Sequence, residues 1–130
     1  MRIISIDTNI YVAFKKGDSN ITEVFRNCDI IYIDIMVIAE LYTGFVLGSQ
    51  ETKNRKELEE FLNSSRVEIL FHEIGTTEYY AAIFKQLKLK GKPIPTNDIW
   101  IAANAMKHGA TLFSLDKHFQ EIENLLLLKI

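Results

Sequence analysis

The chain has 130 residues, of which 48% are hydrophobic and 25% charged, the composition of an ordinary globular protein with one domain over residues 1–130. Its 15 Lys and Arg residues and 17 Asp and Glu residues give a formal net charge of −2, which argues against a protein that grips nucleic acid mainly through backbone phosphates. Cys28 is the single cysteine, so an intrachain disulfide and a thiolate metal cluster are excluded.

Two apolar segments could be mistaken for targeting or membrane signals. The N-terminal stretch MRIISIDTNIYVAF carries Asp7 before any long apolar run and has no cleavage-like site, so it is not expected to be a signal peptide. The most apolar stretch, from Ile30 to Leu47, is interrupted by Asp34 and Glu40, which argues against a membrane span. These patterns predict a cytoplasmic protein without a membrane partner.

In the first half of the chain, short apolar runs alternate with helical patterns. Thr8 is placed to cap the first helix, and Gly17 ends it. The segment Ile35–Leu47 is apolar on nearly every face, which predicts a buried helix. The elements expected here are a strand at Arg2–Ile6, helices at Ile10–Lys15 and Ile21–Asn27, a strand at Asp29–Ile33, and helices at Ile35–Leu47 and Glu51–Asn63.

The second half continues the alternation of strands and helices. Gly91 and Pro93 end a long amphipathic helix. Short buried strands that alternate with helices favour a parallel sheet covered on both faces, so the expected fold class is α/β. The expected elements are a strand at Val67–Phe71, helices at Thr76–Lys90 and Asp98–His108, a strand at Thr111–Leu115, a short helical turn near Phe119, and a last strand at Leu125–Lys129.

Four carboxylates occupy positions that an α/β fold would bring together. Asp7 and Asp116 each end a predicted strand, Glu40 lies inside the apolar helix, and Asp98 opens the helix before the strand that ends at Asp116. Ligands of open parallel sheets bind at the carboxyl ends of the strands. Four acids that converge there repel one another unless cations neutralise them, and oxygen ligands suit Mg²⁺ or Mn²⁺. The pattern therefore predicts a metal site.

Each acid also has an ordinary structural explanation. Asp7 could serve turn chemistry, Asp116 could cap the short helix after it, and Asp98 suits the positive end of a helix dipole. Glu40 is harder to explain, because its helix leaves almost no solvent-facing stripe and no nearby Arg or Lys offers a partner. Taken jointly, the four favour an acidic metal site over four coincidences.

These motifs resemble those of the PIN-domain ribonucleases. The matching pieces are DTN after the first strand, a lone Glu in the apolar helix, NDIWIAA, and TLFSLDKHF, in the order and spacing typical of that family. The subgroup that the chain is most similar to is the toxin component of VapBC-type toxin–antitoxin pairs.

The resemblance implies a catalytic and metal-binding set of Asp7, Glu40, Asp98 and Asp116, with Mg²⁺ as cofactor and Mn²⁺ as a substitute. It implies supporting roles for Thr8, Asn9 and Ser114. It also implies a Rossmann-like sheet of about five parallel strands in the order 3-2-1-4-5. The expected partners are RNA, a second copy of the chain in a homodimer, and a small VapB-like antitoxin, whose Arg or Lys could reach the acids from across the helices at Ile10–Lys15 and Ile35–Leu47.

Other charged residues carry weaker hypotheses. Lys85, Lys88, Lys90 and Lys92 lead into the loop before Asp98; they could be a solvated face or could contact RNA phosphates, and we assign weak RNA binding to Lys85, Lys88 and Lys92. His72, His108 and His118 lack metal-ligand spacing and are interpreted as surface or cap residues, although His118 lies near the acids in sequence. Trp100 is interpreted as a core or dimer contact.

Two other function classes share the expected fold. A phosphotransferase or receiver-like domain would need neighbouring acids beside the first strand and a Lys at the end of a late strand, whereas Asp7 stands alone and Lys117 follows Asp116. A catalytically weak RNA- or protein-binding module would have no reason to keep four mutually repelling carboxylates. A metal-dependent endoribonuclease is therefore the favoured hypothesis, in which the side chains hold the metal and position water.

Overall fold

The computed structural model describes residues 1–129 and contains a parallel four-stranded sheet in the order β3-β2-β1-β4. Its strands are β1 (Ile3–Ile6), β2 (Ile30–Asp34), β3 (Val67–Leu70) and β4 (Thr111–Phe113). In the centre of the sheet Ile4 pairs with Ile31 and Ile6 with Ile33, so buried apolar side chains lie side by side. The α/β class and the 3-2-1-4 part of the expected order are confirmed.

The prediction of a fifth strand at Leu125–Lys129 is wrong. The Leu112 N–H donates to the Leu126 carbonyl (2.8 Å), and the Leu128 N–H donates to the Leu112 carbonyl (2.9 Å). These two bonds form one isolated parallel bridge between Leu112 and Leu127. Because β4 is only three residues long, the contact does not extend into a ladder. The C-terminal segment therefore lies beside β4, where a fifth strand was expected, without becoming one.

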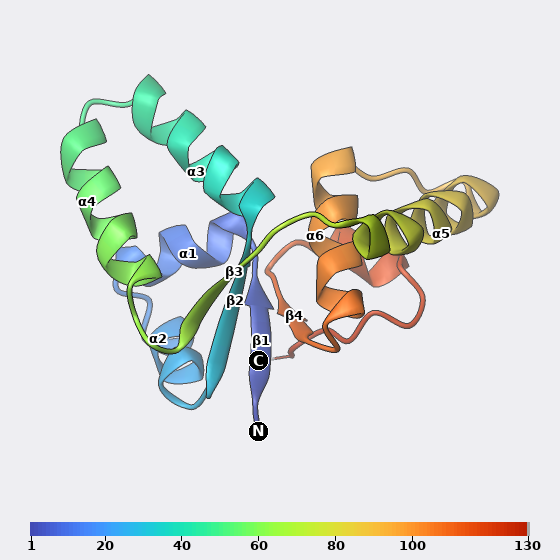
Figure 1. Ribbon diagram of the computed structural model, residues 1–130, viewed down its shortest axis with the longest axis horizontal. Helices are drawn as coiled ribbons and strands as arrows, with labels where there is room; N and C mark the ends of the chain where they lie inside the picture. The colour runs from blue at the N-terminus through green and yellow to red at the C-terminus, as the bar shows by residue number, and fades with distance from the viewer. Residues whose placement is uncertain (130) are drawn as a thin grey trace.

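Two groups of helices cover the two faces of the sheet (Figure 1). The chain runs outward from β1 through β2 to β3 and then returns past β1 to form β4 on the other edge. Because parallel crossovers are right-handed, this change of direction puts the helices after β3 on the opposite face of the sheet. Within residues 1–129, no helix is long and apolar enough to cross a membrane. The helices are α1 (Thr8–Lys15), α2 (Ser19–Arg26), α3 (Ile35–Leu47) and α4 (Glu51–Leu62) on one side, and α5 (Ile74–Lys90), α6 (Thr96–Lys107) and the short 3₁₀ helix η1 (Lys117–Glu121) on the other.

Four helices, α1, α2, α5 and α6, each begin two residues earlier than the sequence suggested. Asp7, and not Thr8, caps α1, because its Oδ1 accepts a hydrogen bond from the Ile10 N–H at 3.1 Å. The helix α5 begins at Ile74, and α6 begins at Thr96, directly after Pro95. With this start Asp98 remains in the first turn of α6.

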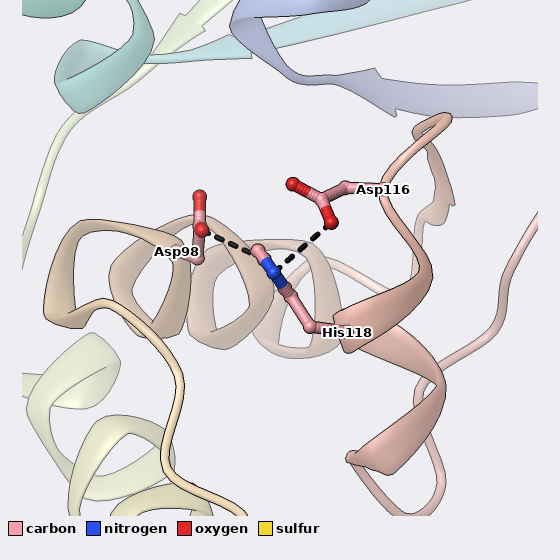
Figure 2. A group of neighbouring side chains, drawn as sticks. All are labelled: Asp98, Asp116 and His118. Carbon is pink, nitrogen blue, oxygen red and sulfur yellow. Dashed lines mark ion pairs between the residues drawn. The ribbon is translucent and has the colours of Figure 1, made fainter.

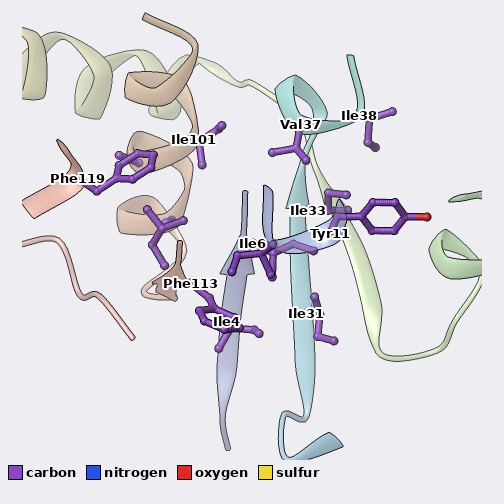
Figure 3. Packing of buried hydrophobic residues seen from close by; sticks show 14 of the residues in the cluster. Ile4, Ile6, Tyr11, Ile31, Ile33, Val37, Ile38, Ile101, Phe113 and Phe119 are labelled. Carbon is purple, nitrogen blue, oxygen red and sulfur yellow. The ribbon is translucent and has the colours of Figure 1, made fainter. Parts of the chain in front are cut away.

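The core lies between the sheet and the helices on both faces (Figure 3). On the α6 side, Phe113 of β4 and Phe119 of η1 are fully buried with Ile101, which anchors η1 against the sheet. The expectation that α3 is buried on nearly every face is wrong at its C-terminal end. There Val46 and Leu47 are 52% and 82% exposed, because the end of α3 extends beyond the strands (Figure 1).

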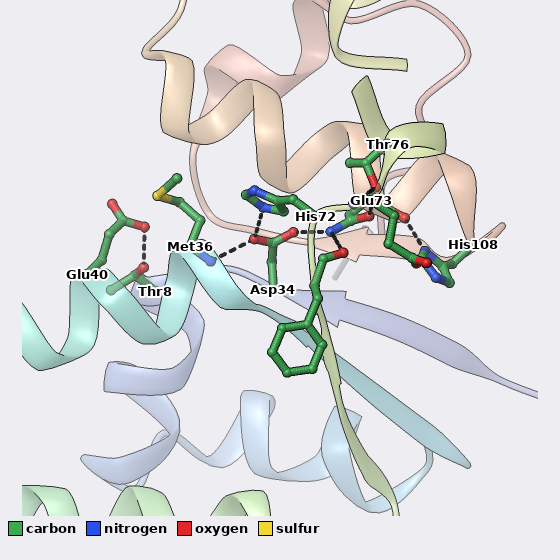
Figure 4. Close-up of polar contacts among 10 residues, drawn as sticks. Thr8, Asp34, Met36, Glu40, His72, Glu73, Thr76 and His108 are labelled. Atoms are coloured by element: carbon green, nitrogen blue, oxygen red, sulfur yellow. Dashed lines mark hydrogen bonds and ion pairs between the residues drawn. The ribbon is translucent and has the colours of Figure 1, made fainter. Parts of the chain in front are cut away.

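A buried polar network joins β2 and α3 to the α5–α6 pair (Figure 4). Asp34 is fully buried. Its Oδ1 accepts a hydrogen bond from the Met36 N–H (2.7 Å) and lies 2.8 Å from His72 Nε2, and its Oδ2 accepts a hydrogen bond from the Asn104 amide (2.7 Å). Thr76 in turn donates to Asn104 at 3.0 Å. The interpretation of His72 as a surface or cap residue is wrong, because it lies between Asp34 and the α6 helix.

Candidate active site

Asp7 lies at the carboxyl end of β1, next to the end of β4. Its Oδ1 caps α1, and its Oδ2 accepts a short hydrogen bond from the Ser114 hydroxyl. The same Ser114 oxygen accepts a hydrogen bond from the Asp116 N–H at 2.9 Å, which ties the segment after β4 to the strand end. Asp7 is only 6% exposed, so its position is fixed on both oxygens.

Glu40 reaches the same end of the sheet from the middle of α3. It is half-buried, and its two carboxylate oxygens accept hydrogen bonds from the Thr8 hydroxyl (2.8 Å) and from the Asn97 amide (2.7 Å). Figure 4 shows the Thr8–Glu40 contact. The hydrogen-bond partners of Glu40 are thus neutral polar groups of α1 and α6, and they orient its carboxylate without an Arg or Lys side chain.

Asp98 and Asp116 meet across the imidazole ring of His118 (Figure 2). His118 Nε2 lies 2.7 Å from Asp98 Oδ2, and its Nδ1 lies 3.0 Å from Asp116 Oδ1. Asp116 is the residue before η1, but its side chain makes no capping hydrogen bond. The capping alternative for Asp116 is therefore wrong, and its carboxylate faces the cluster.

The electrostatics of the cluster follow from burial and crowding. Burial raises the pKa of Asp7 above its usual 3.8, the hydrogen bonds from Ser114 and Ile10 lower it, and the charges of Asp116 and Glu40 raise it again. Burial also raises the pKa of Asp98, with His118 acting against the shift and Glu40 and Asp116 adding to it. The charges of Glu40 and Asp116 therefore act on both Asp7 and Asp98.

Most of the residues singled out from the sequence lie together. Asp7, Thr8, Glu40, Asp98, Ser114 and Asp116 form one hydrogen-bonded and electrostatically coupled group. Asn9 is exposed in the first turn of α1 and lies outside this group. Lys85, Lys88 and Lys92 are exposed on and after the end of α5, while Lys90 is paired with Glu121 at 3.3 Å.

Comparison with known proteins identifies the family. The model of the PIN domain matches residues 4–125. The chain belongs to the PIN domain family. It is 36% identical over 130 residues to "Ribonuclease VapC2" of Rickettsia felis, covering 96% of each chain. It is 30% identical over 126 residues to "Ribonuclease VapC2" of Haemophilus influenzae, covering 95% of this chain and 92% of the relative. The expected resemblance to VapC-type proteins is confirmed.

Solved structures show the same fold as this PIN domain. The VapBC2 complex of Rickettsia felis, bound to a DNA fragment from its promoter, superposes with a TM-score of 0.86 at 33% identity and covers 97% of both chains. VapBC-1 from nontypeable Haemophilus influenzae gives a TM-score of 0.87 at 27% identity, covering 98% of this chain and 97% of the other. Both of these structures are toxin–antitoxin complexes.

Sequence reasoning missed two side chains of the cluster. Asn97 donates a hydrogen bond to Glu40. The signal that could have found it is its position directly before Asp98 in the motif TND. His118 was interpreted as a surface or cap residue, and this is wrong, because its ring lies between two of the acids. Its spacing of two residues from Asp116 was the signal that could have found it. His108, in contrast, does follow α6 as its C-cap.

The side chains of the cluster fit a divalent metal ion. One ligand atom each from Asp98, Asp116 and His118 lies within 4.8 Å of the others. His118 Nε2 is buried and lies 2.7 Å from Asp98 Oδ2, but this contact lacks the alignment of a normal hydrogen bond within the described residues. Carboxylate oxygens are ligands that Mg²⁺ and Mn²⁺ accept, and an imidazole nitrogen is a ligand for transition-metal ions.

The raised pKa values of Asp7 and Asp98 predict how stability varies with pH in the metal-free PIN domain. A native carboxyl with a raised pKa binds its proton more tightly than the unfolded chain does, so its stabilising contribution is complete below about pH 4 and is lost as the pH rises through the native pKa. The Asp7→Asn/Asp98→Asn double variant lacks this loss. Urea unfolding between about pH 4 and pH 7 should show the variant gaining stability relative to the wild type as the pH rises. A constant difference would contradict the shifts.

Proposed function

We propose that this PIN domain is a divalent-metal-dependent endoribonuclease that acts as the toxin of a toxin–antitoxin pair. The observation that carries the proposal is the meeting of Asp7, Glu40, Asp98 and Asp116 at the carboxyl ends of β1 and β4. The relatives named Ribonuclease VapC support RNA as the substrate class. With RNA as the substrate, we expect the protein to act in the cytoplasm.

In this proposal the four acids hold Mg²⁺, for which Mn²⁺ can substitute. When bound, one or two such ions would supply an activated water and stabilise the charge that builds up on the phosphate and the leaving oxygen. The chain's own contribution is to fix the acids before substrate arrives. Ser114 orients Asp7, while Thr8 and Asn97 orient Glu40, so little conformational freedom remains to be lost during the reaction.

The polar residues beside the acids have different roles. The Ser114 hydroxyl links Asp7 to the backbone of Asp116, so a change at either end of this pair alters the spacing of the acids. Asn9, which is exposed in the first turn of α1 and outside the acidic group, would contact the RNA backbone. Lys85, Lys88 and Lys92 would attract RNA phosphates, and their exposure supports that weaker assignment.

The proposed antitoxin has a groove to occupy. A hollow of about 320 Å³ lies between α1, α3 and α4, and its apolar lining comes from Tyr11, Val12, Leu41 and Phe45. Phe14, also on α1, does not line this hollow; it packs on Phe25 with ring centroids 4.5 Å apart. The VapBC complexes among the similar structures support a VapB-like partner, and we also expect a homodimer.

The experiment that tests the proposed function measures cleavage of a mixed RNA substrate by the purified chain. We expect cleavage in Mg²⁺ or Mn²⁺, none in excess EDTA, and recovery when the metal is returned. Full activity in EDTA would contradict metal dependence. Binding of RNA without cleavage in any metal would instead favour the catalytically weak binding module.

A further inference from the structure

The ring of His118 occupies the space between two of the proposed metal ligands (Figure 2). We propose that His118 is itself a ligand of the divalent ion and that its nitrogen biases the site toward Mn²⁺ over Mg²⁺. This inference rests on the proposed function, because it concerns the same acidic cluster. It adds a ligand that the four-carboxylate set does not contain.

The distances support a shared ion. The three ligand atoms of Asp98, Asp116 and His118 lie within 4.8 Å of one another. Metal–ligand bonds of about 2.0–2.2 Å put ligands on opposite sides of an ion about 4.0–4.4 Å apart. Movements of a few tenths of an ångström, within reach of side-chain rotation, would therefore bring all three into range of one ion.

The ring is also held in place before any ion arrives. His118 packs against Phe119 with ring centroids 4.8 Å apart, and Phe119 is 1% exposed, so the core anchors the turn that carries the imidazole. Its Nε2 is buried, faces Asp98 and has no well-directed hydrogen bond within residues 1–129. Its present partner, Asp98 Oδ2 at 2.7 Å, is poorly aligned for a hydrogen bond, and a metal ion held between the two side chains would give both of them a well-directed partner.

The identity of the donor atom determines the metal preference. Mg²⁺ favours oxygen ligands and keeps several of its waters. Imidazole nitrogen binds transition-metal ions more readily than it binds Mg²⁺. A site built from carboxylates alone would accept both ions, whereas a site that includes His118 gains affinity mainly for Mn²⁺.

The test compares the full chain with its His118→Ala variant in a Mn²⁺ titration followed by electron paramagnetic resonance, with Mg²⁺ as a competitor. We expect the variant to lose about tenfold or more in Mn²⁺ affinity, an effect that even outer-shell partners of metal sites produce. The Mg²⁺ affinity should change much less, so the Mn²⁺ to Mg²⁺ ratio falls. Pulsed measurements on the wild type should show coupling of Mn²⁺ to a nitrogen, and the variant should lack it.

His108→Ala is the matched control, because His108 lies at the opposite end of α6 from Asp98. It should keep both the affinity ratio and the nitrogen coupling. If the wild-type protein binds Mn²⁺ and cleaves RNA but His118→Ala changes neither the affinity ratio nor the nitrogen coupling, His118 only pairs with the acids. The inference about His118 then fails while the proposed function stands. Nitrogen coupling without cleavage in any metal would support the ligand and overturn the proposed function. No Mn²⁺ binding by the wild type would overturn both.

Discussion

Replacement of Asp98 by asparagine is expected to lower the rate of RNA cleavage by about a thousandfold or more, because a bound ion contributes several kcal/mol to the stabilisation of charge in such reactions. The change keeps the size of the side chain and removes the charge that faces His118, Glu40 and Asp116. Single-turnover cleavage of a defined RNA at saturating Mg²⁺ would measure the effect.

The matched control is Asp18→Asn, which alters an exposed aspartate at the N-terminus of α2. That variant should cleave RNA at the wild-type rate. Since burial raises the pKa of Asp98, the Asp98→Asn protein should also be at least as resistant to urea as the metal-free wild type near neutral pH. Cleavage by Asp98→Asn within about tenfold of the wild type would mean that Asp98 is not part of the catalytic set.

Replacement of Asp34 by alanine is expected to lower the free energy of unfolding by about 3–5 kcal/mol, because the donors around it would be left buried and unpaired. Asp34 is fully buried and satisfies the Met36 N–H, the Asn104 amide and His72 at once. No other position described in residues 1–129 gives a buried acid three such partners. Equilibrium unfolding in urea, read by circular dichroism, would measure the loss.

The comparison for this variant is Asp18→Ala, which removes an N-cap at the surface and should cost about 1 kcal/mol. The two substitutions are chemically identical and differ in burial and in the number of donors left behind. Equal losses would show that Asp34 acts only as a helix cap and that the network beyond it contributes nothing. Asp34→Ala should also cleave RNA normally at temperatures where it remains folded.

The positions of the acids were predictable because they follow from strand ends. Asp7 directly follows β1, and the residues after β4 reach the same edge, so any parallel α/β arrangement with β1 beside β4 brings them together. Glu40 and Asp98 were predictable as members of motifs, but not from periodicity alone. The argument that Glu40 is buried in a helix without a solvent-facing side was wrong in detail, since Val46 and Leu47 are exposed.

The partners of the acids were not predictable, because they depend on side-chain geometry between distant segments. Asn97 lies 57 residues from Glu40 in sequence, and Asn104 lies 70 residues from Asp34. Pairing over such separations depends on how α6 packs against α3, and a single sequence carries no direct signal for the packing of two distant helices. The fifth strand failed for a related reason: the Leu-rich segment Leu125–Leu128 has strand-like composition, but β4 offers too short an edge to pair with it.

The stack formed by Trp100 gives the molecule a built-in optical signal. Trp100 is the single tryptophan of the chain; its ring centroid lies 4.3 Å from that of His72, with an angle of 10° between the planes, and 4.4 Å from that of Tyr80. Indole emission depends strongly on such neighbours, and Trp100 lies two residues after Asp98 on α6. Any shift of α6 against α5 would open the stack and change the emission. Stopped-flow fluorescence of the unlabelled protein can therefore time the arrival of an ion, an RNA or an antitoxin.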